Sequence, residues 1–273
     1  MKPNTVLGVA ITHPDREVWP GVTKLDLARY YETVGERLLA HIRDRRLTLV
    51  RCPDGAQSKC FFQRHLKGSK TYFSFGTVEQ VIQAVQNGAV EFHTWGATEP
   101  RSDRPDRIVL DLDPGPGVSW KKLVEATRTV KTVLDGLGLE CFVKTTGGKG
   151  LHVVVPLEPK LGWDEVKDFS HSIAEFLERA NGKVFIVNMA KSRREGKVFV
   201  DYLRTGETAS AVAAWSARAR PGATVSMPIE WKELAAADLR ARFTIKTATR
   251  RRDPWKDYRT TRQSITTKMR KSL

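Results

Sequence analysis

Apolar residues recur every three or four positions across residues 21–44, which predicts an amphipathic helix. Thr23 is its expected N-cap, because a threonine hydroxyl can accept a hydrogen bond from the first turn. The predicted buried face consists of Leu27, Tyr30, Tyr31, Val34, Leu38 and Leu39. Shorter apolar patterns predict the other elements before residue 105: a strand at 46–51, a helix at 77–88 closed by a glycine, and a strand at 89–95.

From residue 107 onward the predicted elements follow the order strand, helix, strand, strand, helix, strand. Strands are predicted at 107–112, 140–145, 151–156 and 197–203, with a further one near 208–215, and helices at about 119–136 and 163–180. This order is that of a ferredoxin-like or RRM-like sheet. We therefore predict an α+β protein in which an RRM-like (ferredoxin-like) sheet with flanking helices is joined to an N-terminal α/β lobe. The basic segment KSRREGK is interpreted as a hairpin, and the tail from Asp253 as helical.

The chain carries 46 Lys and Arg against 31 Asp and Glu, a formal net charge of +15. A surplus of that size favours a polyanionic partner, nucleic acid first and an acidic membrane second. A basic protein that is merely soluble is the alternative, since charge alone does not decide between them. With 273 residues, 40% of them apolar, the chain can bury the core of one large domain or of two joined lobes.

The three cysteines, Cys52, Cys60 and Cys141, include no CxxC pair. Their number and spacing predict neither a disulfide framework nor a zinc site, and instead indicate buried thiols in a reducing compartment. The N-terminus lacks the apolar segment of a signal peptide, and no apolar run approaches the length of about 18 residues that spans a membrane. We therefore expect a cytoplasmic protein that does not bind membranes.

Two acids lie at the end of the apolar run in the segment VLDLDPGPG. Asp111 and Asp113 share a face of the predicted strand, because strand side chains alternate. Two neighbouring carboxylates repel one another unless a cation lies between them, and oxygen ligands suit Mg²⁺ or Mn²⁺ better than zinc. A solvated acidic strand end is the alternative interpretation.

The segment TTGGKGLHV places three glycines around Lys149, directly before an apolar strand. Glycines leave backbone N–H groups accessible to an anion, while Thr146 supplies a hydroxyl and His152 begins the strand. The pattern is not a Walker A loop, since a strand follows it. We favour a triphosphate cradle over the alternative, a tight hairpin turn.

A third acid, Asp201, lies in the apolar segment KVFVDYLR, three residues before Arg204. Burying a lone acid is costly without a partner. Together with Asp111 and Asp113 it would complete a three-carboxylate site for two divalent ions, as two-metal phosphoryl transfer requires. A surface ion pair between Asp201 and Arg204 is the alternative.

These motifs together resemble the polymerase domain of bacterial DNA ligase D, a member of the archaeo-eukaryotic primase superfamily. The resemblance rests on HTWG (93–96), PDRIVLDLDPGPG (105–117), TTGGKGLHVVVPL (145–157), VFVDYLR (198–204) and AAWSARARPGATVSMPIEW (213–231). HPDREVWP, TKLDLARYYETV, RCPDG and FFQRH resemble the N-terminal motifs of that domain. The resemblance therefore spans nearly the whole chain and implies the archaeo-eukaryotic primase fold.

The resemblance implies a template-directed nucleotidyltransferase that extends 3′ ends and fills short gaps, often preferring ribonucleotides, in Ku-dependent non-homologous end joining. Its implied partners are DNA ends, gaps and template-primers, NTPs or dNTPs, Ku and a separate DNA ligase, within the nucleoid-associated cytoplasm of a bacterium. It also implies two divalent ions, Mn²⁺ or Mg²⁺, held by Asp111, Asp113 and Asp201. The implied nucleotide-binding residues are His93, Thr146, Gly148, Lys149, His152, Arg204, Ser210 and Arg218.

The same resemblance implies a pocket for the 5′-phosphate on the downstream side of a gap, formed by His13, Arg16 and Lys24. A helix N-terminus at Thr23 would assist it, because helix N-termini attract anions. The aromatic pair Phe61 and Phe62 would stack on the template, although strand alternation allows one of the two to belong to the core.

The expected organisation is a single primase-polymerase domain over 1–273, with an N-terminal lobe at 1–104, an RRM-like core at 105–235 and a basic C-terminal segment at 236–273. Thr205 stands where the family usually has asparagine, and AAWS stands where APYS is usual, which could alter nucleotide contacts. The chain contains no ligase K-x-D-G motif, so the sequence is consistent with a stand-alone polymerase or with an excised domain.

Three other functions remain open from the sequence. A non-catalytic module that binds DNA ends would keep the 5′-phosphate pocket, a metal-dependent nuclease would also use carboxylates, and a primase would make primers without a pre-existing 3′ end. The three acids argue against the first function, and the glycine-lysine turn argues against the second. The choices between Mg²⁺ and Mn²⁺ and between ribose and deoxyribose stay open.

Overall fold

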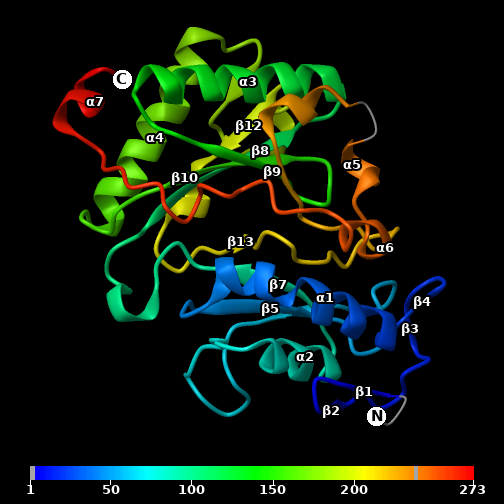
Figure 1. The fold of residues 1–273 in the computed structure, drawn as a ribbon. Helices are drawn as coiled ribbons and strands as arrows, with labels where there is room; N and C mark the ends of the chain where they lie inside the picture. The colour runs from blue at the N-terminus through cyan, green and yellow to red at the C-terminus, as the bar shows by residue number, and fades with distance from the viewer. Residues whose placement is uncertain (1–3, 237–238) are drawn as a thin grey trace. The chain divides into compact units, whose positions relative to one another are not determined.

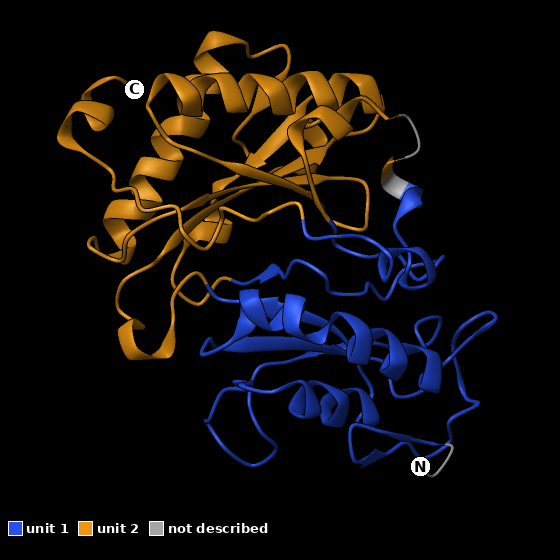
Figure 2. Ribbon diagram, viewed as in Figure 1, with its two compact units in different colours: residues 1–95, 210–227, 240–253 blue, residues 96–209, 228–239, 254–273 orange. Residues whose placement is uncertain are grey.

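The computed structural model describes residues 4–236 and 239–273 (Figure 1). The chain divides into two compact units, each assembled from three segments (Figure 2). Unit 1 comprises residues 1–95, 210–227 and 240–253, and unit 2 comprises residues 96–209, 228–239 and 254–273. Residues 210–227 therefore pack with the N-terminal part of the chain, although they follow the last strand of the predicted RRM-like order.

An antiparallel four-stranded sheet forms the centre of unit 1, in the order β13-β7-β5-β6. Helices α1 and α2 pack against one another, and Tyr31 of α1 contacts Phe92 of β7 edge-on. The strands and helices are β5 (Leu47–Arg51), β6 (Phe61–Gln63), β7 (Ala89–Thr94), β13 (Ala211–Val212), α1 (Lys24–Ile42) and α2 (Val78–Gln86). Smaller elements are β1 (Thr5–Val6), β2 (Val9–Ala10), β3 (Glu17–Trp19), β4 (Val22–Thr23) and α6 (Ile245–Ala248).

Helix α1 begins at the predicted N-cap. The Thr23 hydroxyl accepts a hydrogen bond from the Asp26 N–H at 3.1 Å, and the Asp26 carboxylate accepts one from the Thr23 N–H at 2.8 Å. Such a reciprocal pair satisfies two backbone donors that the helix itself leaves unpaired. All six residues of the predicted apolar face are buried, so the helical periodicity identified this part of the core correctly.

Gly35 allows helices α1 and α2 to approach closely. A Cβ atom at this position would lie 2.3 Å from Cγ1 of Val78, the first residue of α2. Any larger side chain must therefore separate the two helices or displace Val78. The contact fixes α2, which directly precedes β7 in the chain.

Unit 2 is built on a six-stranded sheet in the order β11-β12-β8-β10-β9-β14. The four strands of the predicted β-α-β-β-α-β order are adjacent and antiparallel, as β12-β8-β10-β9, which is the ferredoxin-like arrangement. Helices α3 and α4 cover one face of this sheet (Figure 1). The elements are β8 (Arg107–Pro114), β9 (Phe142–Thr145), β10 (Leu151–Pro156), β11 (Phe185–Ile186), β12 (Val198–Asp201), β14 (Pro228–Ile229), α3 (Trp120–Gly136) and α4 (Trp163–Ala180).

The predicted α+β fold class and the RRM-like sheet are confirmed, but the interpretation of KSRREGK as a hairpin is wrong. Strands β11 and β12 run parallel, with Phe185 paired to Val198, so the segment between them is a crossover and not a tight turn.

Short 3-10 helices interrupt the loops: η1 (Glu99–Arg101), η2 (Lys191–Arg193), η3 (Tyr202–Thr205) and η4 (Trp231–Ala235). Helix α5 (Leu239–Arg242) lies at the boundary between the two units in the sequence.

Most of the C-terminal tail has no regular secondary structure, so the prediction of a helix from Asp253 is also wrong. Only α7 (Thr267–Lys271) is helical in this tail. Trp255 donates a hydrogen bond to the Val143 carbonyl at 3.1 Å, and Gln263 donates to the carbonyls of Glu140 and Pro156, both at 2.8 Å. These side chains bind the tail along β9 and β10, and a continuous helix could not follow the strands in this way.

Cys52 and Cys60 form a disulfide, which contradicts the prediction of buried thiols at these positions. Arg51 pairs with Phe61 across the β5–β6 hairpin, so the next residues outward, Cys52 and Cys60, face each other with their Cα atoms 4.4 Å apart. That separation is typical of a non-hydrogen-bonded cross-strand pair. The spacing across a CPDG turn was the available signal. Cys141 is a buried thiol, as predicted, and burial raises its pKa to about 12.

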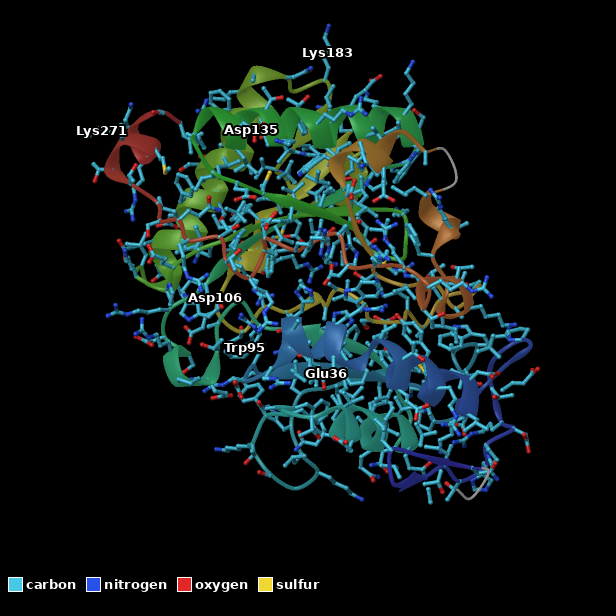
Figure 3. The ribbon with its side chains drawn as sticks, in the orientation of Figure 1. Glu36, Trp95, Asp106, Asp135, Lys183 and Lys271 are labelled. Carbon is cyan, nitrogen blue, oxygen red and sulfur yellow. A yellow bond between two sulfur atoms is a disulfide. The ribbon has the colours of Figure 1, made fainter. Side chains whose placement is uncertain are left out.

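Within residues 4–236 and 239–273, none of the helices has both the length and the apolar character needed to cross a bilayer. Among the cations, Lys183 and Lys271 of unit 2 are exposed at the surface (Figure 3).

Replacing Gly35 by alanine should lower the free energy of unfolding by about 1–3 kcal/mol, because the new methyl group overlaps Val78. Gly136→Ala is the matched control, since a Cβ there meets nothing within 4 Å. It should be neutral or stabilise by up to about 1 kcal/mol. Urea unfolding followed by circular dichroism measures both values. Equal unfolding midpoints for the two variants would contradict this account of the α1–α2 contact.

Candidate active site

One face of the unit 2 sheet carries a row of charged and polar side chains, one from each of four neighbouring strands. Asp111 of β8 is paired with Asp201 of β12 on one side and with His152 of β10 on the other. His152 is paired in turn with Lys144 of β9. Residues paired across antiparallel strands share a face, and Asp113 lies two positions beyond Asp111 on that same face. The register of the sheet therefore brings together the three acids that lie far apart in sequence.

Cations and a histidine surround the carboxylates of this row. His152 Nε2 lies 3.3 Å from Asp111 Oδ1. Arg204 Nε lies 3.1 Å from Asp201 Oδ2 and 3.6 Å from Asp111 Oδ2, so its guanidinium bridges the two acids. The Leu203 N–H donates to Asp201 Oδ1 at 3.1 Å, which orients that carboxylate at the end of β12.

Burial opposes ionisation of all three acids, but with different outcomes. It raises the pKa of Asp113, and the neighbouring charges of Asp111 and Asp201 raise that pKa further. Burial also raises the pKa of Asp201, where the attraction of Arg204 offsets only part of the effect. At Asp111, His152, Arg204 and Lys144 outweigh burial, so its pKa lies below the usual value. Two of the three carboxylates are therefore short of positive charge.

The donor set fits a hard divalent cation. Asp111 Oδ1 is buried and accepts no hydrogen bond despite the nearby His152 ring, so it retains a lone pair for an ion. Carboxylate oxygens are the ligands that Mg²⁺ and Mn²⁺ prefer. In the described part of the chain no three such side chains already surround a common point, and Arg204 bridges two of them. An ion bound through the Oδ2 atoms of both Asp111 and Asp201 would have to replace this guanidinium.

His152 lies buried in the row, between Asp111 and Lys144. Its burial, reinforced by the positive charge of Lys144, lowers its pKa to about 4. The imidazole is therefore neutral at physiological pH. Lys144 is itself almost fully buried and was not singled out from the sequence. The sequence signal that could have found it was its position at the start of the segment KTTGGKG, at the end of a predicted strand beside the acidic strand.

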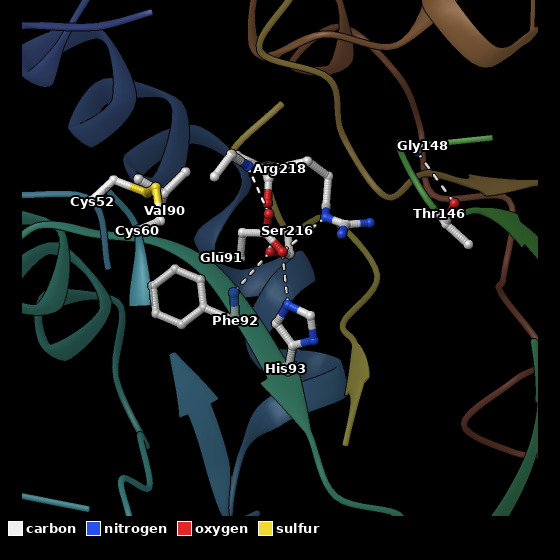
Figure 4. Close-up of polar contacts among 12 residues, drawn as sticks. Cys52, Cys60, Val90, Glu91, Phe92, His93, Thr146, Gly148, Ser216 and Arg218 are labelled. Atoms are coloured by element: carbon white, nitrogen blue, oxygen red, sulfur yellow. Dashed lines mark hydrogen bonds and ion pairs between the residues drawn. A yellow bond between two sulfur atoms is a disulfide. The ribbon is translucent and has the colours of Figure 1, made fainter. Parts of the chain in front are cut away.

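The glycine-rich segment forms the hairpin between β9 and β10. Thr146 Oγ1 donates to the Gly150 carbonyl at 3.0 Å and accepts a hydrogen bond from the Gly148 N–H at 3.2 Å (Figure 4). A Cβ at Gly150 would lie 2.7 Å from the Leu112 carbonyl oxygen and 3.2 Å from Asp113 Oδ1, so only glycine fits there. The Thr146 hydroxyl stabilises the turn itself, and the turn brings the charge of Lys149 close enough to lower the pKa of Asp113.

Unit 1 contains a second cluster, formed by Glu91, His93 and Arg218 (Figure 4). Glu91 Oε2 accepts from Arg218 Nε at 2.9 Å and lies 2.7 Å from His93 Nε2, while Oε1 accepts from the Ala219 N–H at 2.7 Å. Burial opposes ionisation of Glu91, but His93 and Arg218 outweigh it and hold its pKa at about 2. Glu91 was not singled out from the sequence, although an acid in the apolar run AVEFHTW is the same signal that identified Asp201.

Backbone contacts hold residues 216–219 beside β7. The Tyr31 hydroxyl donates to the Val90 carbonyl at 2.8 Å and accepts from the Ala217 N–H at 2.9 Å. The Ser216 hydroxyl accepts from the Phe92 N–H at 2.9 Å. These bonds position Arg218 opposite Glu91. Ser210 directly precedes β13, in which Val212 pairs with His93.

Both aromatic residues of FFQRH are at the surface, so neither belongs to the core, as strand alternation would have allowed for one of them. Phe61 is 42% and Phe62 is 70% exposed. Phe62 shares a face with His93, because it pairs with Val50 and Val50 pairs with Glu91, and the Phe62 and His93 rings are 5.8 Å apart. On the other face, Arg51 lies over the Phe61 ring at 5.7 Å. Strand β6 is at the edge of the sheet.

His13, Arg16 and Lys24 lie together at the start of α1. The Lys24 N–H donates to the Arg16 carbonyl at 2.8 Å, the Leu25 N–H to the Pro14 carbonyl at 3.1 Å, and the Lys24 ammonium to the Thr12 carbonyl at 2.9 Å. The first N–H groups of α1 are thus already paired, which corrects the expectation that the helix N-terminus itself would bind phosphate. Burial and the charge of Arg16 lower the pKa of Lys24 to about 8.

Comparisons with known proteins place the chain in one family. A family model described as the LigD primase-polymerase domain matches residues 23–258. The chain belongs to the LigD primase-polymerase domain family. It is 42% identical over 97% of its length to the multifunctional non-homologous end joining protein LigD of Pseudomonas aeruginosa, and 32% identical over 85% of its length to LigD of Mycolicibacterium smegmatis.

The alignments cover 34% and 33% of those two proteins, so the chain spans about a third of the length of the curated relatives it matches. Among solved structures, the polymerase domain of Mycobacterium tuberculosis ligase D in complex with DNA matches with a TM-score of 0.84 and 30% identity. That match covers 92% of this chain and 98% of the solved one. The LigD family thus accounts for the fold of nearly the whole chain.

Proposed function

We propose that this LigD-family chain is a metal-dependent, template-directed nucleotidyltransferase that extends 3′ ends and fills short gaps in DNA with NTPs or dNTPs. The observation that carries the proposal is the row formed by Asp201, Asp111 and His152 across the unit 2 sheet, with Asp113 and Lys149 beside it. A nuclease would need the acids but not a lysine on a glycine turn next to them. The similarity to LigD polymerase domains supports the same choice.

Asp111, Asp113 and Asp201 would hold Mg²⁺ or Mn²⁺, which when bound activates the attacking 3′-hydroxyl and neutralises the leaving pyrophosphate. Lys149 and Arg204 supply positive charge for a triphosphate on this face. His152, whose pKa of about 4 keeps it neutral, can donate or accept a hydrogen bond there without repelling a cation. Thr146 and Gly148 shape the turn that carries Lys149.

In unit 1, His93, Ser210 and Arg218 would contribute nucleotide contacts, and Phe62 a stacking surface for a template base. Stacking on an exposed aromatic ring contributes about 1–3 kcal/mol per base in proteins that bind single strands. His13, Arg16 and Lys24 would bind the 5′-phosphate on the downstream side of a gap through their side chains. The relatives are LigD proteins of bacterial end joining, so we propose that pathway, with Ku and a separate ligase as partners at the bacterial nucleoid.

The deciding experiment is incorporation of a labelled nucleotide on a short-gap DNA with and without a downstream 5′-phosphate. Reactions in Mg²⁺ and in Mn²⁺, with ribonucleotides and with deoxyribonucleotides, report metal and sugar choice together. Templated addition that the phosphate stimulates is the expected result. Binding without incorporation would instead indicate a DNA-end-binding module, and synthesis without a primer would indicate a primase.

Asp111→Asn should reduce incorporation by about 10²-fold or more, because it removes a negatively charged ligand from the proposed metal site. DNA affinity should change by less than about twofold, since the acids bind no phosphate. Asp103→Asn, at a largely exposed acid of unit 2, is the matched control and should keep full activity. Primer extension and fluorescence anisotropy measure the two properties. Extension at the wild-type rate by Asp111→Asn would refute the metal-site assignment.

The double variant Arg16→Ala, Lys24→Ala should weaken binding to a 5′-phosphorylated gap by about tenfold or more, since hydrogen bonds to charged groups contribute about 1.5–3 kcal/mol. Binding to the same gap without the phosphate should change little. Arg43→Ala removes a cation from the opposite end of α1 and serves as the control. Equal losses on the two DNA substrates would show that Arg16 and Lys24 are not a phosphate pocket.

The preference for a 5′-phosphorylated gap should decline as the pH rises above 8. The pKa of Lys24 is about 8 in the DNA-free protein, and the ammonium loses its proton and its charge above that value. Linkage then predicts a loss of up to about tenfold per pH unit, while the phosphate keeps its charge, because its second pKa is about 6. Lys24→Arg, which stays charged, should remove this dependence. If Lys24→Arg had the same pH profile as the wild type, a group other than Lys24 would be responsible for the loss of preference above pH 8.

A further inference from the structure

Glu91 is a buried acid that the carboxylate site of unit 2 does not explain. It is 4% exposed, in the middle of the apolar strand β7. Burying a carboxylate is costly unless hydrogen bonds and opposite charges compensate. Three hydrogen-bond donors converge on this carboxylate, and their arrangement indicates what it does.

Both oxygens of the Glu91 carboxylate are engaged, and each in a different way. Oε1 accepts from the Ala219 backbone N–H, which is a structural contact. Oε2 accepts from Arg218 Nε at 2.9 Å and lies 2.7 Å from His93 Nε2 (Figure 4). The second oxygen thus connects two side chains that come from different segments of unit 1.

The contact with Glu91 decides which ring nitrogen of His93 carries the proton. A carboxylate accepts hydrogen bonds and cannot donate them, so His93 Nε2 must be protonated to make the 2.7 Å contact. In the neutral ring, Nδ1 is then the hydrogen-bond acceptor. The pKa of Glu91, about 2, keeps the carboxylate ionised throughout the range in which enzymes are assayed.

We propose that Glu91 is a positioning residue for nucleotide binding: it fixes His93 in the Nε2–H tautomer and holds the Arg218 guanidinium by its Nε edge. His93 then presents Nδ1 as an acceptor for a hydroxyl of the nucleotide sugar, and Arg218, held through Nε, supplies positive charge to the same nucleotide. This proposal rests on the proposed polymerase function. It adds a determinant of sugar recognition that contacts no substrate itself.

Glu91→Gln is the informative substitution, because glutamine has nearly the same shape but one acceptor and one donor. If its oxygen faces Ala219, its NH₂ group faces the Arg218 Nε–H, and two donors oppose each other. His93 can relieve part of this conflict by moving its proton from Nε2 to Nδ1. A protonated Nδ1 can no longer accept a hydrogen bond from a sugar hydroxyl. If the oxygen faces His93 instead, the NH₂ group opposes the Ala219 N–H. No orientation of the amide reproduces the carboxylate.

The first test reads the tautomer directly. ¹⁵N-histidine-labelled full-length protein is examined by two-bond ¹⁵N–¹H correlation at pH 7.5, and the His93 signals are assigned by their loss in His93→Gln. The expected wild-type ring is protonated at Nε2 only, and Glu91→Gln should shift it toward protonation at Nδ1. Protonation at Nδ1 in the wild type, at both nitrogens, or no change in Glu91→Gln would overturn the proposal.

The second test measures incorporation of a ribonucleotide and of the matching deoxyribonucleotide. Glu91→Gln should raise the nucleotide KM about tenfold or more, reduce kcat less, and change the ribo-to-deoxyribo preference, as expected when a hydrogen-bond partner is misplaced. Glu36→Gln is the matched control, because Glu36 projects from α1 with its side chain 77% exposed (Figure 3). Thermal unfolding verifies that each variant folds.

Glu91→Asp keeps the charge but retracts it by one methylene, so it should recover part of the wild-type KM and sugar preference. It also keeps the proposal testable if Glu91→Gln fails to fold. No incorporation by the wild type would refute the proposed polymerase function, while the tautomer measurement would still stand. Wild-type incorporation with Glu91→Gln and Glu91→Asp indistinguishable from Glu36→Gln would overturn the role of Glu91 alone.

Discussion

The antiparallel register of β8 with its two neighbours determines which polar side chains of unit 2 lie side by side. It pairs Asp111 with Asp201 on one side and with His152 on the other. A slip of one residue in either pairing would turn one partner to the opposite face and separate the acids. The buried Leu112, between Asp111 and Asp113, faces the core and makes such a slip costly, because it would bury an acid in its place. Apolar packing on one face thus fixes the polar arrangement on the other.

This arrangement stores an electrostatic cost in the folded chain. Asp113 and Asp201 have raised pKa values, so the folded state binds their protons more tightly than the unfolded state does. Their contribution therefore becomes destabilising as the pH rises through the carboxyl range. Asp111 has the opposite sign: its lowered pKa contributes stability above the unfolded value, and that stability is lost as the pH falls. Lys144 and Arg204 limit the net cost, and a bound cation would reduce it further.

The sequence alone predicted those features of the fold and the site that depend on the local pattern of apolar and polar residues. The helices predicted before residue 181, the β-α-β-β-α-β order and the shared face of Asp111 and Asp113 follow from periodicity, and the structure has them. Features that depend on tertiary contacts were out of reach: the strand register and the C-terminal tail bound through Trp255. Glu91 was within reach of the same argument that identified Asp201, since both are acids in apolar strands.

Each unit places a buried carboxylate against one histidine and one arginine, yet the two sites differ in what they leave unsatisfied. Glu91 receives three donors on its two oxygens, and its pKa of about 2 describes a charge that is fully compensated. Asp111 has an oxygen that accepts no hydrogen bond, and an adjacent acid, Asp113, whose pKa is raised. A compensated carboxylate can only orient its neighbours, whereas an under-compensated cluster attracts a cation. This difference in electrostatic compensation is the physical reason for proposing a positioning role for Glu91 and metal binding for Asp111, Asp113 and Asp201.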